Sequence, residues 1–147
     1  MAVSERCALV LWGRYCDEAA AAIFVATLRA AGLRVWLVGI SGGRIAGSHG
    51  LRIQPDLTPS QALPLADQTC CVVIPCVALL LLRFLNDPTV EALLHRAAAA
   101  QATVVISAAP APNPPAYLAQ AVTYPPTATL YQFATALAAT LVQDAPS

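Results

Sequence analysis

A serine at the end of an apolar strand is the residue best placed for chemistry in this sequence. Residues 102–110, Ala-Thr-Val-Val-Ile-Ser-Ala-Ala-Pro, predict a buried strand that runs into a tight turn at Ser107. The small residues Ala108 and Ala109 allow a strand-turn-helix elbow, which holds a nucleophile over the carboxyl edge of a parallel sheet. An activated serine at such an elbow carries out acyl transfer, with the backbone N–H of Ala108 as a donor to the oxyanion.

This serine needs a base, because almost none of its hydroxyl is ionised at neutral pH. Glu18 and His49 are the candidates, and either of them with Ser107 would make a small serine hydrolase. However, His49 lies in a glycine-rich loop, where a surface or loop-capping role is favoured. His95 is expected to face solvent beside Arg96 on a predicted helix. The sequence therefore supplies few partners for the elbow.

The cysteines predict neither a metal site nor a redox motif. Five are present, at Cys7, Cys16, Cys70, Cys71 and Cys76. There is no Cys-x-x-Cys pair, and neither histidine lies at a metal-ligand spacing from a cysteine, so we expect reduced, buried thiols and no cofactor. Cys76 lies at a strand end near the elbow and offers an alternative, a cysteine-based stress or redox binding domain. Its apolar neighbours Ile74 and Val77 would keep that thiol protonated and inert.

Composition indicates one domain over residues 1–147 with a protein partner. The chain is 58% hydrophobic and 11% charged, whereas soluble domains carry about 25% charged residues. Eight arginines, no lysine and eight acidic residues leave no net charge, which argues against nucleic-acid binding. The surplus of apolar residues favours self-association or docking on a larger assembly.

The sequence also disfavours three further classes of protein: membrane-spanning, secreted and phosphate-loop nucleotide-binding. The strongly apolar, uncharged run at residues 68–82 has 15 residues and contains Pro75, so it is shorter than the roughly 20 residues that cross a bilayer. The N-terminal residues have no apolar stretch of a secretory signal, and we expect a cytoplasmic protein. The glycine-rich segment 39–50 lacks the terminal Gly-Lys-Ser/Thr of a phosphate-binding loop and is expected to be a turn-rich connection.

Strand and helix patterns alternate along the chain. Apolar runs predict strands at residues 7–12, 33–38, 69–74 and 103–106, with a short one at 51–53. Helices are predicted over 19–31, after Asp87-Pro88, and after Pro126 with a capping box of Thr129 and Gln132. We expect Asp17 to cap the first helix and Gly32 to end it. Strand, helix and strand within about 30 residues predict a right-handed crossover in a parallel sheet.

The chain resembles the ThiJ/PfpI family of the class I glutamine amidotransferase-like superfamily. The resemblance lies in residues 8–11, 28–35, 47–56, 71–75 and 104–110, and its most specific part is Gly-Leu-Arg-Ile-Gln-Pro-Asp at 50–56. It implies a flavodoxin-like three-layer α/β/α sandwich with a mostly parallel sheet, frequently homodimeric. The chain passes from Tyr124 directly to its last helix, without a strand-rich stretch that members usually have, so we expect a truncated version of this fold.

The resemblance also implies where a catalytic site would lie. Active members carry a cysteine at the elbow, a glutamate near the start of the first helix, and often a histidine nearby. Here the elbow residue is Ser107, and Tyr124 takes the histidine position. An ungapped alignment places Ala20 at the glutamate position, although Glu18 is only two residues earlier and a small slip would restore a carboxylate.

A third departure concerns the oxyanion pocket. The strand-end Pro-Gly-Gly of the family is Pro75-Cys76-Val77 here. Side chains at both glycine positions restrict the backbone conformations and the close approach that such a pocket uses. We therefore expect no catalytic residue, and the vestigial positions are Ser107, Glu18, Ala20, Tyr124 and Cys76.

The leading hypothesis is a pseudoenzyme, a catalytically inactive ThiJ/PfpI-like domain that acts as a structural or accessory protein-binding subunit. The apolar segment 77–85 either packs in the core or forms an exposed interface. Its candidate interface residues are Leu79, Leu80, Leu82 and Phe84. The serine hydrolase and the cysteine-based domain stay as alternatives.

Overall fold

The protein is built on a five-stranded parallel sheet. The computed structural model describes residues 6–40, 44–76, 83–107, 118 and 120–143. The strand order is β2-β1-β5-β6-β7, and every neighbouring pair is parallel. The strands are β1 (Cys7–Trp12), β2 (Arg34–Gly39), β5 (Thr69–Ile74), β6 (Thr103–Ile106) and β7 (Val122–Thr123). The predicted mostly parallel α/β sheet is confirmed, and the predicted bounds of β1, β5 and β6 match the structure.

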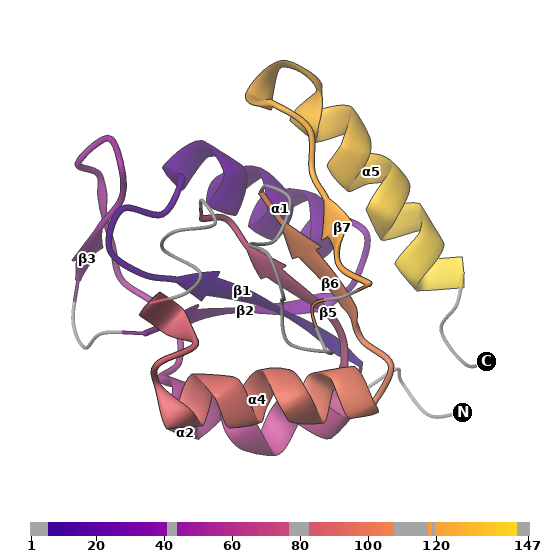
Figure 1. Ribbon diagram of the computed structural model, residues 1–147. Coiled ribbons are helices and arrows are strands. Elements are labelled where there is room, and N and C mark those ends of the chain that lie inside the picture. Colours follow the sequence, from indigo (N-terminus) through magenta and orange to yellow (C-terminus); the bar gives the residue numbers. More distant parts are fainter. Residues whose placement is uncertain (1–5, 41–43, 77–82, 108–117, 119, 144–147) are drawn as a thin grey trace.

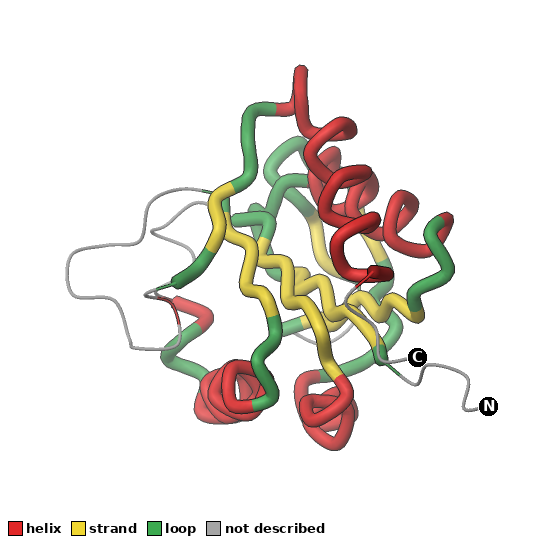
Figure 2. The backbone as a smooth tube through the Cα atoms, turned by 90° about the vertical axis from the view of Figure 1, so that its right-hand side faces the viewer, coloured by secondary structure: helices red, strands yellow, loops and turns green. Residues whose placement is uncertain are grey.

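Helices cover both faces of this sheet, which gives three layers (Figures 1 and 2). Helices α1 (Glu18–Ala30) and α5 (Thr127–Gln143) pack together on one face. The other face carries α2 (Pro59–Ala62), the 3₁₀ helix η1 (Leu63–Gln68) and α4 (Pro88–Ala99). A two-stranded antiparallel unit of β3 (Ile45–Ala46) and β4 (Arg52–Ile53) lies outside the main sheet.

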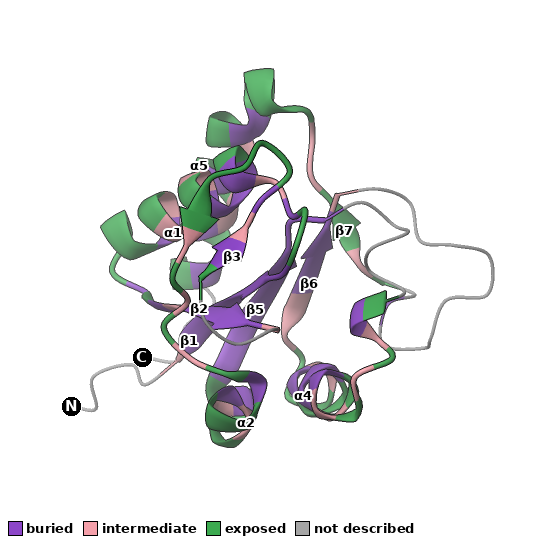
Figure 3. Ribbon diagram, turned by 90° about the vertical axis from the view of Figure 1, so that its left-hand side faces the viewer, coloured by how far each residue is buried: buried purple, intermediate pink, exposed green. Residues whose placement is uncertain are grey.

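The central strands are apolar because they are covered on both sides. All six residues of β1 and all six of β5 are buried (Figure 3). A parallel strand between two helical layers has no solvent-facing side, so its sequence is a continuous apolar run and does not alternate. Because these strands are also parallel, the carboxyl ends of β1, β5 and β6 lie at one edge of the sheet.

Helix ends follow the predicted capping. The Asp17 carboxylate accepts a hydrogen bond from the Ala20 N–H at 3.2 Å, and Gly32 has φ +96° after the end of α1. At α4, the Asp87 side chain accepts from the Thr89 N–H at 2.9 Å. The predicted buried stripe of α4 is confirmed at Val90, Leu93, Leu94 and Ala97.

Two helix starts differ from the prediction. The capping box at Thr129 is wrong: α5 begins at Thr127, and the Thr129 hydroxyl donates to the Pro126 carbonyl at 3.4 Å. A capping box does occur at α2, which the sequence analysis missed. There the Thr58 hydroxyl accepts from the Gln61 N–H while the Gln61 side chain accepts from the Thr58 N–H. Pro59 in the first turn was the available signal.

The outer edge of β2 is closed by the segment that follows β4. The Asp56 carboxylate accepts the Leu37 N–H at 2.9 Å and pairs with Arg29 at 3.2 Å. The N–H groups of Asp56 and Leu57 both donate to the Leu37 carbonyl. Where its backbone N–H and C=O groups are already hydrogen-bonded, an edge strand cannot pair with a strand of another molecule. In the described part of the chain, no helix has the length and apolarity to cross a membrane.

Candidate functional site

Three polar side chains meet at the carboxyl edge of the sheet. Ser107 follows β6, Tyr124 follows β7, and Asp17 precedes α1. With Pro125, Pro126 and Thr127 they line a cavity of about 280 Å³. The sheet topology explains the meeting, because parallel strands end at the same edge. The predicted vestigial positions Ser107 and Tyr124 therefore do lie together.

Tyr124 is neutral at physiological pH. Burial raises the pKa of its phenol, a hydrogen bond with Ser107 lowers it in part, and the negative charge of Asp17 raises it again. The Tyr124 N–H donates to the Ile106 carbonyl at 2.9 Å, which holds the residue beside the end of β6. A neutral phenol does not take a proton from a serine hydroxyl, so this pair lacks the base that a nucleophile needs.

Asp17 is a site-lining residue that the sequence analysis identified only as a helix cap. Its carboxylate is engaged with the Ala20 N–H, and its own N–H donates to the Pro75 carbonyl at 2.8 Å. The signal that could have found it is its place at the carboxyl edge, directly after the loop that follows β1. It supplies negative charge beside Tyr124 while it stabilises the first turn of α1.

Glu18 does not point into this cavity but binds the turn at residues 47–51. Its Oε2 accepts the N–H groups of His49 at 2.8 Å and Leu51 at 3.0 Å. Its Oε1 accepts the Ser48 hydroxyl at 3.2 Å and lies 3.2 Å from His49 Nδ1. The side chain is only 7% exposed. Gly47 is required beside it, because a Cβ at that position would collide with the Glu18 carboxyl carbon.

Neither Ala20 nor Glu18, the two candidates for the glutamate position of the family, can act as a base for Ser107. Ala20 is fully buried and has no functional group. Glu18 is a carboxylate committed to the backbone of another loop. Its role is to position the 47–51 turn.

The hydrogen bonds at Glu18 change its titration. Burial alone would raise the pKa of this carboxyl group, but the backbone N–H groups, its own among them, and the His49 side chain lower it from 4.5 to about 2. Donors that point at a carboxylate stabilise its charged form. The Glu18 side chain is therefore ionised at neutral pH.

This shift predicts acid sensitivity. Because the folded pKa lies below the unfolded value, the contribution of Glu18 to stability is complete above about pH 4.5 and disappears as the pH falls toward about 2. We expect the free energy of unfolding, measured with urea between about pH 6 and about pH 3, to fall more steeply in the wild-type protein than in Glu18→Gln. Equal slopes for the two proteins would contradict this assignment.

The histidines lie away from Ser107. The His49 side chain is 81% exposed, and its Nδ1 contacts Ser48 and Glu18. His95 is exposed on α4, as predicted. Within the described ranges, no histidine or carboxylate makes a hydrogen bond to the Ser107 hydroxyl.

Cys16 and Cys76 form a disulfide, which corrects the expectation that both are reduced. Their Cα atoms are 4.6 Å apart although the residues are separated by 60 positions. The reason is topological: β1 and β5 are neighbours in the sheet, so the segments after them meet at one edge. The remaining cysteines are free and buried, as predicted, and burial raises the pKa of each thiol. They are Cys7, Cys70 and Cys71.

Phe84 is not a surface residue, so its place in the predicted interface is wrong. It is 7% exposed, and its ring packs so closely on Gly13 that a Cβ there would overlap it. The other candidate interface residues, Leu79, Leu80 and Leu82, lie outside the described residues.

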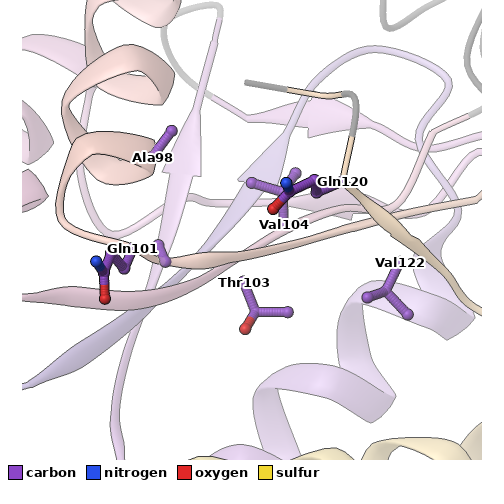
Figure 4. Close-up of a pocket in the computed structure, with 7 residues that line it drawn as sticks. Ala98, Gln101, Thr103, Val104, Gln120 and Val122 are labelled. Carbon is purple, nitrogen blue, oxygen red and sulfur yellow. The ribbon is translucent and has the colours of Figure 1, made fainter. Parts of the chain in front are cut away.

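A larger cavity of about 600 Å³ lies at the start of β6, at the end of the strand away from Ser107 (Figure 4). Thr103 and Val104 at the start of β6, with Gln101 and Gln120, contribute to its lining. None of the residues that line it has an ionisable side chain. It is therefore separate from the Ser107 cavity and offers no acid or base.

Comparisons with known proteins agree with this architecture. No family model and no curated protein matches the sequence. Among solved structures, a DJ-1 superfamily protein from Salmonella typhimurium is 18% identical with a TM-score of 0.73, over 95% of this chain and 91% of that one. Drosophila melanogaster DJ-1beta is 21% identical with a TM-score of 0.73, over 92% and 90% of the two chains.

A third solved structure, Schizosaccharomyces pombe DJ-1, is 13% identical with a TM-score of 0.70, over 96% of this chain and 93% of that one. At such identities the likeness establishes the fold, and it is the fold that the resemblance implied. The chain has the fold of the DJ-1/ThiJ/PfpI superfamily, with a serine-tyrosine pair at the carboxyl edge of its sheet.

Proposed function

We propose that this protein is a catalytically silent DJ-1/ThiJ/PfpI-like domain that works as a protein-binding subunit. The observation that carries the proposal is the state of the groups around Ser107. The Ser107 hydroxyl is paired with a neutral phenol, and the Glu18 carboxylate is held by the 47–51 turn. A nucleophile without a base in hydrogen-bond reach is not activated.

The serine hydrolase alternative has less support. Among the residues that the structure describes, Asp17 is the one carboxylate that lines the cavity, and it caps α1 through the Ala20 N–H. Hydrolysis would also need a donor pair for the oxyanion, and Cys76 in its disulfide occupies a position where a flexible glycine would be used. The cavity thus keeps polar side chains without an acid-base pair.

A protein-binding role is supported by the surface of α5. This helix spans 17 residues without a charged side chain. Its exposed residues include Tyr131 at 66% and Val142 at 43%. Between α5 and α1 lies an apolar groove of about 530 Å³, lined largely by alanines and threonines. An uncharged helical face favours self-association or docking on a larger assembly.

Two measurements test the two halves of this proposal. A serine-directed fluorophosphonate probe is expected to leave Ser107 unlabelled, with the same signal from wild type and from Ser107→Ala. Light scattering of the purified protein, or of the complex isolated from native extracts, is expected to give a mass above that of one chain. Replacing Thr135 and Ala139 by arginine should reduce that mass by charging the α5 face.

Labelling that is lost in Ser107→Ala would favour the hydrolase and refute the silent domain. A single-chain mass in native extracts that the α5 arginine variant does not change would refute the binding role. A matched control is the replacement of exposed Ser60 on α2 by arginine, which adds charge on the other face of the sheet.

A further inference from the structure

We propose that the Cys16–Cys76 disulfide is a reversible redox site that accepts electrons from small thiols. In this site Cys76 is the sulfur that is attacked and Cys16 is the sulfur that leaves. The inference goes beyond the proposed binding role and does not depend on it. It also differs from the hypothesis of a cysteine-based domain with a free thiol at Cys76, because here the reactive group is the disulfide.

The disulfide joins the segments that build the carboxyl edge of the sheet. Cys16 lies between β1 and α1, and Cys76 follows β5. The Cys16 carbonyl accepts the Ser48 N–H at 2.8 Å, and the next residue, Asp17, donates to the Pro75 carbonyl at 2.8 Å. One covalent bond therefore fixes the β1–α1 loop, the end of β5 and the 47–51 turn relative to one another.

The surroundings of Cys16 stabilise negative charge on its sulfur. The Gly13 N–H donates to Cys16 Sγ at 3.2 Å. Cys16 also directly precedes the N-cap of α1, where the helix dipole favours an anion. A sulfur whose thiolate is stabilised is the better leaving group in thiol–disulfide exchange. These contacts assign the leaving role to Cys16.

The attacked role falls to Cys76, because it is the partner of the leaving sulfur. Both residues are buried, Cys76 at 3% and Cys16 at 0% exposure. Exchange requires a thiolate to approach Cys76 Sγ, so it takes place in a locally opened state of this edge of the sheet.

The reaction balances with a small dithiol as the reductant. Its thiolate attacks Cys76 Sγ, the Cys16–Cys76 bond breaks, and the electron pair moves to Cys16 Sγ beside the Gly13 N–H. The second thiolate of the dithiol then attacks the dithiol sulfur that is bonded to Cys76, and the Cys76 thiolate is released. The dithiol becomes a disulfide, and the protein gains two electrons and two protons.

A strained residue beside the disulfide links this chemistry to conformation. Tyr15 has φ +68°, a left-handed backbone conformation that is unfavourable for a bulky side chain. It is held between Cys16 and a hydrogen bond from its N–H to the Ala46 carbonyl at 3.1 Å. Loss of the cross-link allows this segment to relax. The sequence predicts a cytoplasmic protein, and disulfides in that compartment are usually transient, catalytic or redox-sensing.

Trp12 provides an optical signal for the change. It is fully buried at the end of β1, and its Nε1 donates to the Ile45 carbonyl at 3.1 Å. It therefore connects the strand before the β1–α1 loop to the β3–β4 unit. In a Trp36→Phe background, Trp12 is the sole tryptophan, so movement of this segment alters the fluorescence of one known residue.

The test uses the native protein without denaturant. With reduced glutathione, acid quenching and peptide mapping, we expect the mixed disulfide on Cys76. With dithiothreitol, we expect Cys16 and Cys76 to become alkylatable, a shift of Trp12 emission, and an unchanged far-ultraviolet circular dichroism spectrum. Oxidised glutathione should restore the starting state.

The control is the Cys16→Ala/Cys76→Ala variant, which keeps the three buried thiols and should not respond to dithiothreitol. An adduct on Cys16 would overturn the assignment of roles. Reduction that occurs only in denaturant, fully reduced protein with unchanged Trp12 emission, or loss of helical signal on reduction would overturn the reversible site.

Discussion

Replacing both Cys16 and Cys76 by alanine is expected to lower the free energy of unfolding by about 4 kcal/mol. The disulfide closes a loop between residues separated by 60 positions. In the chain-entropy account, a cross-link of that length removes much of the freedom of the unfolded chain. The midpoint of thermal unfolding should fall by roughly 10 °C for a chain of this size. Denaturant unfolding of oxidised proteins without reductant measures the difference.

The single variants and a matched cysteine separate the cross-link from local packing. Cys16→Ala and Cys76→Ala should each lose about as much as the double variant, because either change removes the same bond. Cys70→Ala, which removes a buried free thiol, should lose much less. A double variant within about 1 kcal/mol of wild type would mean that the cross-link does not constrain the unfolded chain.

Replacing Glu18 by alanine is expected to lower the free energy of unfolding by about 3 kcal/mol. The change leaves the N–H groups of His49 and Leu51 without their buried acceptor. Unpaired buried donors cost more than the hydrogen bonds contribute when formed, because the groups have lost their water. Urea unfolding at neutral pH measures this loss.

Glu91→Ala is the matched control. Glu91 also lies in the first turn of a helix, but it is exposed, and its replacement should change stability by no more than about 0.5 kcal/mol. Glu18→Gln keeps the size of the side chain but turns an amide toward backbone donors, so we expect an intermediate loss. If Glu18→Ala and Glu91→Ala were equally mild, the 47–51 turn would not depend on the carboxylate.

The sheet could be predicted from the sequence because its strands are apolar on both faces. Residues 7–12, 69–74 and 103–106 are continuous apolar runs without polar alternation, and the first two are followed directly by Gly13 and Pro75. The strand at 122–123 was missed, since two exposed residues carry no periodic signal. The helix at 59–62 was missed because it is a single turn that begins at a proline.

The candidate site could be predicted only in part. The position of Ser107 after β6 follows from a local pattern, and the resemblance to a family supplied Tyr124. The predicted turn at Ala108 and Ala109 lies outside the described residues. The Cys16–Cys76 bond, the capture of Glu18 by the 47–51 turn and the placement of Asp17 in the cavity depend on which strands are neighbours. Spacing along the chain does not reveal these contacts, because the sheet order brings distant segments together.

The two sets of cysteines lie at opposite ends of the sheet. The free Cys7, Cys70 and Cys71 lie in the first halves of β1 and β5, whereas Cys16 and Cys76 lie beyond the ends of the same strands. Six residues of strand separate the two ends by about 20 Å, much farther than a sulfur–sulfur bond can span. Disulfide shuffling between the sets is therefore blocked once the sheet has formed, and the native pairing survives cycles of oxidant and reductant.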